Sequence, residues 1–158
     1  MPDVSIRPVD PEQARALIGK SDALMSGLYP PKSNHFESVP ALQAPNVLFL
    51  GAFVDGALVG CGAVKTLDDD GRYGEIKRLF VLEEHRGKGI SKALMRVLEA
   101  HLAATGVPFA RLETGIRQPR AIALYKGLGY AERGPYGGYA ADPLSLFMEK
   151  PIADPQRR

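Results

Sequence analysis

The segment EIKRLFVLEEHRGKGISKALMRVLEAHLAATG, from Glu75 to Gly106, constrains the fold of this chain more than any other. It runs from an apolar stretch, through a short basic patch with two glycines at 86–89, into a long amphipathic stretch. From about Lys88 to Thr105 apolar residues recur at helical spacing, and charged residues occupy the opposite side. Gly106 is a typical C-terminal stop. The segment therefore predicts a strand, a glycine-rich turn and a helix.

The glycine-rich turn has the chemistry of a phosphate site. A helix start leaves about four backbone N–H groups without intrahelical partners and carries partial positive charge, and glycines let a ligand come close to that backbone. Arg86, Lys88 and Lys92 add full positive charges. An exposed basic turn without a ligand would have the same sequence, so both interpretations stay open here. The spacing matches neither the dinucleotide-binding fingerprint nor the phosphate loop of nucleotide hydrolases.

Strand and helix patterns along the rest of the chain predict one mixed sheet covered by helices. Apolar or alternating runs bounded by turn residues predict strands at 3–9, 46–54, 57–67, 73–82, 109–115, 130–133 and 144–150. Asp55-Gly56 is a strong hairpin signal between two of them. Helical spacing is also found at 11–29, with a pause at 19–21 that is expected to bend or split the helix, and at 119–129. Residues 29–40 and 134–143 are predicted loops, and 1–158 is expected to form a single domain.

Composition and charge favour a cytoplasmic protein without a nucleic-acid or membrane partner. The 158 residues carry a net charge of +2, and the basic residues are scattered except between Arg86 and Lys92. Cys61 is the single cysteine, which excludes an intramolecular disulfide and fits a reducing compartment. The start MPDVSIRPVD has no signal-peptide pattern, and no apolar run is long enough to span a bilayer.

Two motifs in the second half of the chain carry a family resemblance. The segment LFVLEEHRGKGISKAL resembles the acyl-CoA-binding motif of the GNAT superfamily of N-acetyltransferases, with Arg86 to Ser91 in the pattern [Q/R]-x-x-G-x-[G/A]. Ser91 departs from the usual glycine or alanine. The segment ETGIRQPRAIALYKGLGY resembles a later strand-helix element of the family, although Gln118 stands where asparagine is usual. The matching positions there are Ala121, Leu124, Tyr125, Gly129 and Tyr130.

The resemblance implies a fold and a co-substrate. The fold is an α/β (α+β) GNAT-like domain: a central mixed, mostly antiparallel twisted sheet of about seven strands, about four helices, and a V-shaped split between the fourth and fifth strands. Acetyl-CoA is the expected co-substrate, with its pyrophosphate on the glycine-rich loop and its pantetheine arm paired along the strand before it. No metal is expected. The implied cofactor-binding residues are Leu79, Phe80, Val81, Arg86, Gly87, Lys88, Gly89, Ile90, Ser91 and Tyr125.

Acetyl transfer to an amine needs a group that takes the proton of the acceptor. Neutralising an amine with a pKa of about 10.4 at pH 7 costs roughly 4–5 kcal/mol. Glu75, at the entry of the cofactor strand, is the first candidate, as a carboxylate of raised pKa or through water. The alternative is a strand-end carboxylate paired with Lys77. Glu113 is the second candidate for the proton acceptor, and it can equally orient the substrate.

Two further groups would complete the chemistry. A backbone N–H of Phe80 or Val81 is expected to bind the thioester oxygen. The resemblance implies that Tyr125 gives a proton to the departing thiolate; the alternative is a tyrosine packed on the core. Cys61 lies in an apolar strand and is expected to behave as a small hydrophobe rather than a nucleophile.

The predicted loops are expected to hold the acceptor, since their side chains suit a polar ligand. The named candidates are Tyr29, Asn34, His35, Glu113 and Arg117. Exposed loops without a ligand are the alternative.

The resulting expectation is an enzyme that transfers acetyl from acetyl-CoA to a primary amine of a small molecule, by direct attack in a ternary complex. Alternatives are a non-catalytic acyl-CoA-binding module, thioester hydrolysis or O-acyl transfer, and a protein N-acetyltransferase. Many members of the family form dimers, so a homodimer is also an open alternative.

Overall fold

The structure is a computed structural model, and it describes residues 3–33 and 37–153. A seven-stranded sheet has the order β1-β2-β3-β4-β5-β7-β6. Its strands are β1 (Val4–Pro8), β2 (Val47–Val54), β3 (Ala57–Leu67), β4 (Tyr73–Val81), β5 (Phe109–Gly115), β6 (Ala131–Arg133) and β7 (Ser145–Pro151). Every neighbouring pair is antiparallel except β4 and β5, which are parallel. The predicted mixed, mostly antiparallel sheet is confirmed.

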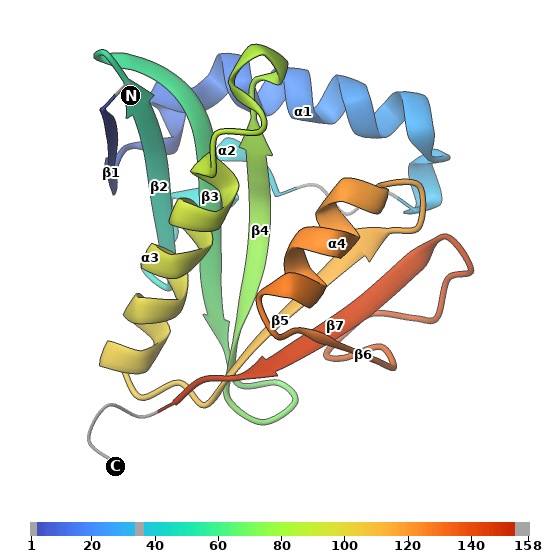
Figure 1. The fold of residues 1–158 in the computed structure, drawn as a ribbon. Coiled ribbons are helices and arrows are strands. Elements are labelled where there is room, and N and C mark those ends of the chain that lie inside the picture. The colour runs from blue at the N-terminus through green and yellow to red at the C-terminus, as the bar shows by residue number, and fades with distance from the viewer. Residues whose placement is uncertain (1–2, 34–36, 154–158) are drawn as a thin grey trace.

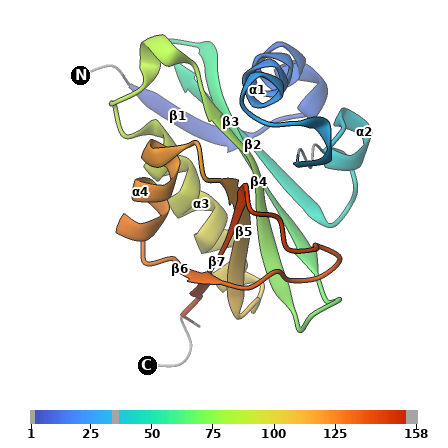
Figure 2. The ribbon, with the colours of Figure 1, turned by 90° about the vertical axis from the view of Figure 1, so that its right-hand side faces the viewer.

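Helices cover both faces of the sheet (Figures 1 and 2). The α-helices are α1 (Arg15–Leu28), α2 (Val39–Leu42), α3 (Ile90–Ala104) and α4 (Pro119–Gly127), and the short 3-10 helices are η1 (Pro11–Ala14), η2 (Pro31–Ser33) and η3 (Glu83–His85). Figure 2 shows α1 and α2 on one face, and α3 and α4 on the other. Each face has its own apolar core.

Alternation along the strands sends neighbouring residues into different cores. On β3, Val64 joins the core under α3 while Cys61 and Ala63 join the core under α1. The helix α3 buries Leu94, Leu98 and other residues of its apolar stripe, as the helical spacing predicts. Removal of these side chains from water is the main stabilising term of both layers.

The helices differ from the expectation in two places. The helix α1 runs without a break through Gly19, because its buried residues Leu17, Ile18 and Ser21 outweigh the cost of about 1 kcal/mol for a glycine inside a helix. The helix α3 begins at Ile90 rather than Lys88, because Gly89 has the left-handed φ of 79°. A residue with that conformation cannot continue a right-handed helix.

The loops are more structured than composition indicated. The predicted hairpin is confirmed, with positive φ at both Asp55 (50°) and Gly56 (81°). Within the first predicted loop, Pro31–Ser33 forms η2, and Ser38 caps α2 by accepting a hydrogen bond from the N–H of Ala41. In the second predicted loop Tyr136 is buried, with 1% of its surface exposed. That loop therefore packs on the sheet.

Candidate active site

The parallel strands β4 and β5 separate after a short stretch of pairing. β4 and β5 pair only at Gly74 with Ala110 and at Glu75 with Arg111. Beyond Glu75, β4 stays with β3 while β5 continues with β7. The expected split between the fourth and fifth strands is therefore confirmed.

A pocket lies in this split. Its walls come from β4 between Glu75 and Leu79, from β5 between Glu113 and Gly115, from the inner side of α1, and from Tyr125 of α4. Since α1 and α4 lie on opposite faces of the sheet (Figure 2), the pocket joins the two faces. Two ligands that approach from opposite faces can meet there.

The glycine-rich loop lies between η3 and α3 and has an open backbone. Gly87 and Gly89 both have φ of 79°, and a Cβ at either position would meet nothing within 4 Å. No side chain caps the start of α3. The N–H groups of this helix start and the cations of Arg86 and Lys88 are suited to a pyrophosphate. The loop therefore fits the phosphate part of coenzyme A.

Three contacts position the basic side chains beside this loop. The Nε–H of Arg86 donates to the carbonyl oxygen of Val81 at 3.1 Å, and its guanidinium lies 5.7 Å from the ring centre of Phe80. The Nζ of Lys88 lies 3.3 Å from Nδ1 of His85. Ser91, where the family pattern has glycine or alanine, lies in the first turn of α3 and is partly buried.

Tyr125 projects from α4 into the pocket. Its side chain is 7% exposed, and its ring packs edge-on against Tyr130 with 5.9 Å between ring centres. Burial raises the pKa of the Tyr125 phenol, and the charge of Glu113 raises it further. The phenol therefore stays protonated across the physiological range, as a proton donor must.

Glu75 is a buried carboxylate held by two tyrosines. Its Oε2 accepts hydrogen bonds from the hydroxyls of Tyr136 at 2.8 Å and Tyr139 at 2.6 Å. Its Oε1 lies 3.5 Å from the Nζ of Lys77, which also contacts Glu37 at 3.3 Å and the hydroxyl of Tyr139 at 3.0 Å. Burial, followed by the charge of Glu75, raises the pKa of both tyrosines. The predicted pairing with Lys77 is present, and Glu75 also lines the pocket.

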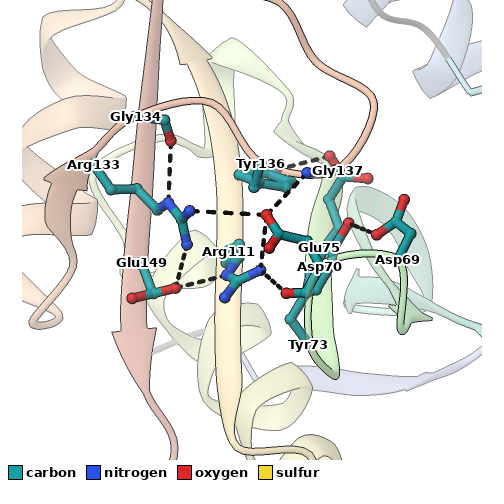
Figure 3. A network of polar contacts seen from close by, with 10 residues as sticks. All are labelled: Asp69, Asp70, Tyr73, Glu75, Arg111, Arg133, Gly134, Tyr136, Gly137 and Glu149. Atoms are coloured by element: carbon teal, nitrogen blue, oxygen red, sulfur yellow. Dashed lines mark hydrogen bonds and ion pairs between the residues drawn. The ribbon is translucent and has the colours of Figure 1, made fainter.

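A second layer of ion pairs holds the loop that carries these tyrosines (Figure 3). Arg111 of β5 donates to Glu149 at 2.6 Å and to the carbonyl oxygen of Asp70 at 2.7 Å. Arg133 donates to the same Glu149 at 2.6 Å, and the carboxylate of Asp70 accepts the N–H of Gly137 at 3.2 Å. The turn before β4 thus fixes the position of the loop over Glu75.

Sequence reasoning placed residues 134–143 in a loop but did not find the role of Tyr136 and Tyr139. They lie 61 and 64 positions from Glu75 along the chain. The only local signal is two tyrosines separated by two residues in a glycine-rich loop. That pattern does not identify a partner.

The predicted acceptor residues are distributed unequally around the pocket. Glu113, half-buried on β5, lines the pocket and accepts a hydrogen bond from the Ser145 hydroxyl at 2.8 Å. Tyr29 also lines it, and its hydroxyl accepts the N–H of Arg117 at 2.9 Å. The Arg117 guanidinium donates to the carbonyl oxygen of Leu28, and Arg117 is not among the described residues that line the pocket.

The other two acceptor candidates, Asn34 and His35, lie outside the described residues.

Cys61 sits on β3, outside the described lining of the pocket, with 1% of its surface exposed. Burial raises the pKa of its thiol to about 12. The thiol donates to the carbonyl oxygen of Arg78 at 3.2 Å. A thiol in this state is a poor nucleophile at neutral pH.

Within residues 3–33 and 37–153 there is no group of three or more His, Cys, Asp or Glu side chains arranged to bind a metal ion. The helices there also lack the combination of length and apolar content needed to cross a bilayer.

Comparison with known proteins agrees with this geometry. The model of the acetyltransferase (GNAT) family matches residues 21–130. An IAA acetyltransferase from Azospirillum brasilense is 44% identical over 154 residues, which are 96% of this chain and 100% of that protein.

Solved structures give the same result. A crystal structure described as an acyl-CoA N-acyltransferase of Klebsiella pneumoniae has 35% identity and a TM-score of 0.79, covering 95% of this chain and 98% of the other. The PaiA N-acetyltransferase of Thermoplasma acidophilum, solved with coenzyme A, shares the fold at 21% identity and a TM-score of 0.72, with 94% of this chain and 99% of the other covered. Three findings lead to the same assignment: the parallel strands that separate beside a buried tyrosine, the open glycine-rich helix start, and these matches. The chain belongs to the GNAT family of acetyltransferases.

Proposed function

We propose that this enzyme transfers the acetyl group of acetyl-CoA to a primary amine of a small molecule, by direct attack in a ternary complex. The observation that carries the proposal is the pocket through the β4–β5 split, which has Tyr125 on one side and two carboxylates, Glu75 and Glu113, on its walls. The relative named for acetylation of IAA supports a small-molecule acceptor.

The cofactor side of the site binds and orients the thioester. Acetyl-CoA supplies the acetyl group in activated form. Arg86, Lys88 and the start of α3 hold its phosphates, and the edge of β4 from Leu79 to Val81, freed by the split, pairs with the pantetheine arm. A backbone N–H of Phe80 or Val81 donates to the thioester oxygen.

Tyr125 acts on the leaving group. Its phenol donates a hydrogen bond to the sulfur as negative charge develops there, and its raised pKa keeps the phenol protonated at neutral pH. Proton transfer from a positioned side chain contributes about 10²–10⁴-fold to a rate. Direct attack is favoured over an acyl-enzyme because Cys61 is buried and protonated.

The carboxylates act on the acceptor. Glu75 or Glu113 takes the proton of the amine, directly or through a water molecule. The pH–rate profiles of Glu75→Gln and Glu113→Gln distinguish them. The base variant loses the acidic limb of the profile, and the other variant keeps it.

We also propose a cytoplasmic location, on the basis of Cys61, which is the single cysteine of the sequence and is buried.

The test is release of free thiol from acetyl-CoA against a panel of amines, namely spermidine, tryptamine, the amino acids and an aminoglycoside, with IAA, the compound in the name of the Azospirillum relative, alongside. The proposal predicts release that depends on one class of amine and falls at least about tenfold in Tyr125→Phe. Tight coenzyme A binding with no turnover on any acceptor would contradict it and favour a binding module. Turnover only on peptides with a free amino terminus would favour a protein N-acetyltransferase.

A further inference from the structure

Arg78 has an unusual backbone conformation for a residue inside a strand. Its φ is 58°, in the left-handed region that favours glycine. Asp55 is the other non-glycine residue with positive φ in the described part of the chain, and it lies in a hairpin turn. An arginine keeps such a conformation only where its surroundings fix it, and such positions concentrate at functional sites.

The conformation produces a bulge in β4. Cys61 of β3 faces Phe80 and Ala63 faces Lys77, so one residue of β3 lies opposite two residues of β4, 78 and 79. Bulges with a left-handed first residue normally use glycine there, and they redirect the strand that follows. Glu75 is the last residue of β4 that pairs with β5, and the bulge begins three residues later. The bulge therefore shapes the edge of β4 that faces the split.

The side chain of Arg78 is tied to two other walls of the pocket. Its guanidinium, 6% exposed, forms an ion pair with Asp22 of α1. It also donates to the carbonyl oxygen of Glu37, from Nε at 3.1 Å and from Nη2 at 2.5 Å. Ser21 and Met25 of α1 and Glu37 itself line the pocket. Three walls of the pocket, from β4, α1 and the segment at Glu37, thus meet at one guanidinium.

We propose that Arg78 is a positioning residue with two separable effects, resting on the proposed function. Its left-handed backbone holds the β4 edge in the shape that orients the thioester. Its guanidinium holds α1 and the segment at Glu37 against that edge, and so sets the acceptor side of the pocket.

Two substitutions separate these effects. Arg78→Gly removes the guanidinium but accepts a φ of 58° without strain. Arg78→Ala removes the same guanidinium and disfavours the conformation. Asp22→Ala removes one partner of the guanidinium and leaves the backbone of β4 unchanged. The carbonyl oxygen of Arg78 that accepts the Cys61 thiol is present in all three variants.

The first readout is amide hydrogen exchange of the free proteins by mass spectrometry, which needs no acceptor. In Arg78→Gly, exchange is expected to rise in residues 15–28 and 37–42 and to stay unchanged in residues 78–81. In Arg78→Ala it is expected to rise in all three segments. In Asp22→Ala it rises in residues 15–28 alone.

The second readout is steady-state kinetics on the amine of the panel that the wild type acetylates fastest. Arg78→Gly is expected to raise the KM of the acceptor about tenfold, the effect of losing a hydrogen bond with a charged group, while kcat stays within about threefold. Arg78→Ala is expected to raise KM similarly and to lower kcat more than about tenfold.

Equal kcat and equal exchange of residues 78–81 in the glycine and alanine variants would overturn the backbone effect. An unchanged acceptor KM and unchanged exchange of α1 in Arg78→Gly would overturn the guanidinium effect. An Arg78→Ala chain that fails to fold while Arg78→Gly folds supports the backbone effect, and Asp22→Ala then tests the guanidinium alone. If the wild type acetylates no amine of the panel, the proposed function fails, while hydrogen exchange still decides the role of Arg78.

Discussion

Removing the hydroxyl of Tyr136 tests whether the loop over Glu75 depends on a buried charged hydrogen bond. Tyr136 is 1% exposed and Glu75 is 5% exposed, and their bond measures 2.8 Å. Tyr136→Phe keeps the ring and its edge-on contacts with Tyr73 and Phe147, at 5.3 and 5.8 Å between centres. A hydrogen bond to a charged group contributes about 1.5–3 kcal/mol. For a chain of this size Tm should fall by about 3–12 °C.

Tyr73→Phe is the matched control. The ring of Tyr73 is also 1% exposed and its hydroxyl also donates to a carboxylate, Asp69, at 2.6 Å. Asp69 is exposed, so water replaces the lost hydroxyl. The expected loss is about 1 kcal/mol or less.

Thermal and urea unfolding at pH 7 measure both variants. If Tyr136→Phe loses no more free energy of unfolding than Tyr73→Phe, the reasoning is refuted, because the burial of Glu75 would then not strengthen its hydrogen bond with Tyr136.

Four further predictions concern the site and the buried phenols. Tyr125→Phe should lower kcat by at least about tenfold; an unchanged kcat would remove Tyr125 from the chemistry. Gly89→Ala should weaken coenzyme A binding, because the φ of 79° at this position is strained for alanine. Gly134→Ala is the control and should bind coenzyme A normally, because a Cβ there also meets no atom within 4 Å and the position has no positive φ. Cys61→Ala should keep the wild-type kcat, and loss of turnover in a folded variant would reopen an acyl-enzyme route. Stability should fall above about pH 10, because burial raises the folded-state pKa of Tyr130, Tyr136 and Tyr139 while unfolded tyrosines lose protons near pH 10. Each such group lowers the unfolding free energy by about 1.4 kcal/mol per pH unit there, and flat urea midpoints between pH 9 and 11 would contradict this.

The fold was predictable from local patterns because those patterns report burial directly. Alternation and apolar runs located the seven strands, and Asp55-Gly56 located a hairpin whose φ values only such residues adopt readily. The glycine-rich helix start was also visible, since its chemistry lies within a few consecutive residues.

The features that were missed depend on contacts between distant parts of the chain. Nothing near Arg78 in the sequence indicates a left-handed residue, and the partners of its guanidinium, Asp22 and Glu37, lie 56 and 41 positions away. The break expected near Gly19 did not occur, because burial against the sheet outweighed local preference. Glu75 was recognised as a candidate, while the tyrosines that hold it come from a loop more than 60 positions later.

The central claim is that the acetyl group passes directly from thioester to amine through the β4–β5 split. Initial rates measured while acetyl-CoA and the best amine of the panel are varied together test it most directly. Direct attack in a ternary complex predicts double-reciprocal lines that intersect, with no acetylated protein in the intact mass when the amine is withheld. Parallel lines, with a protein mass increased by one acetyl group, would contradict the account.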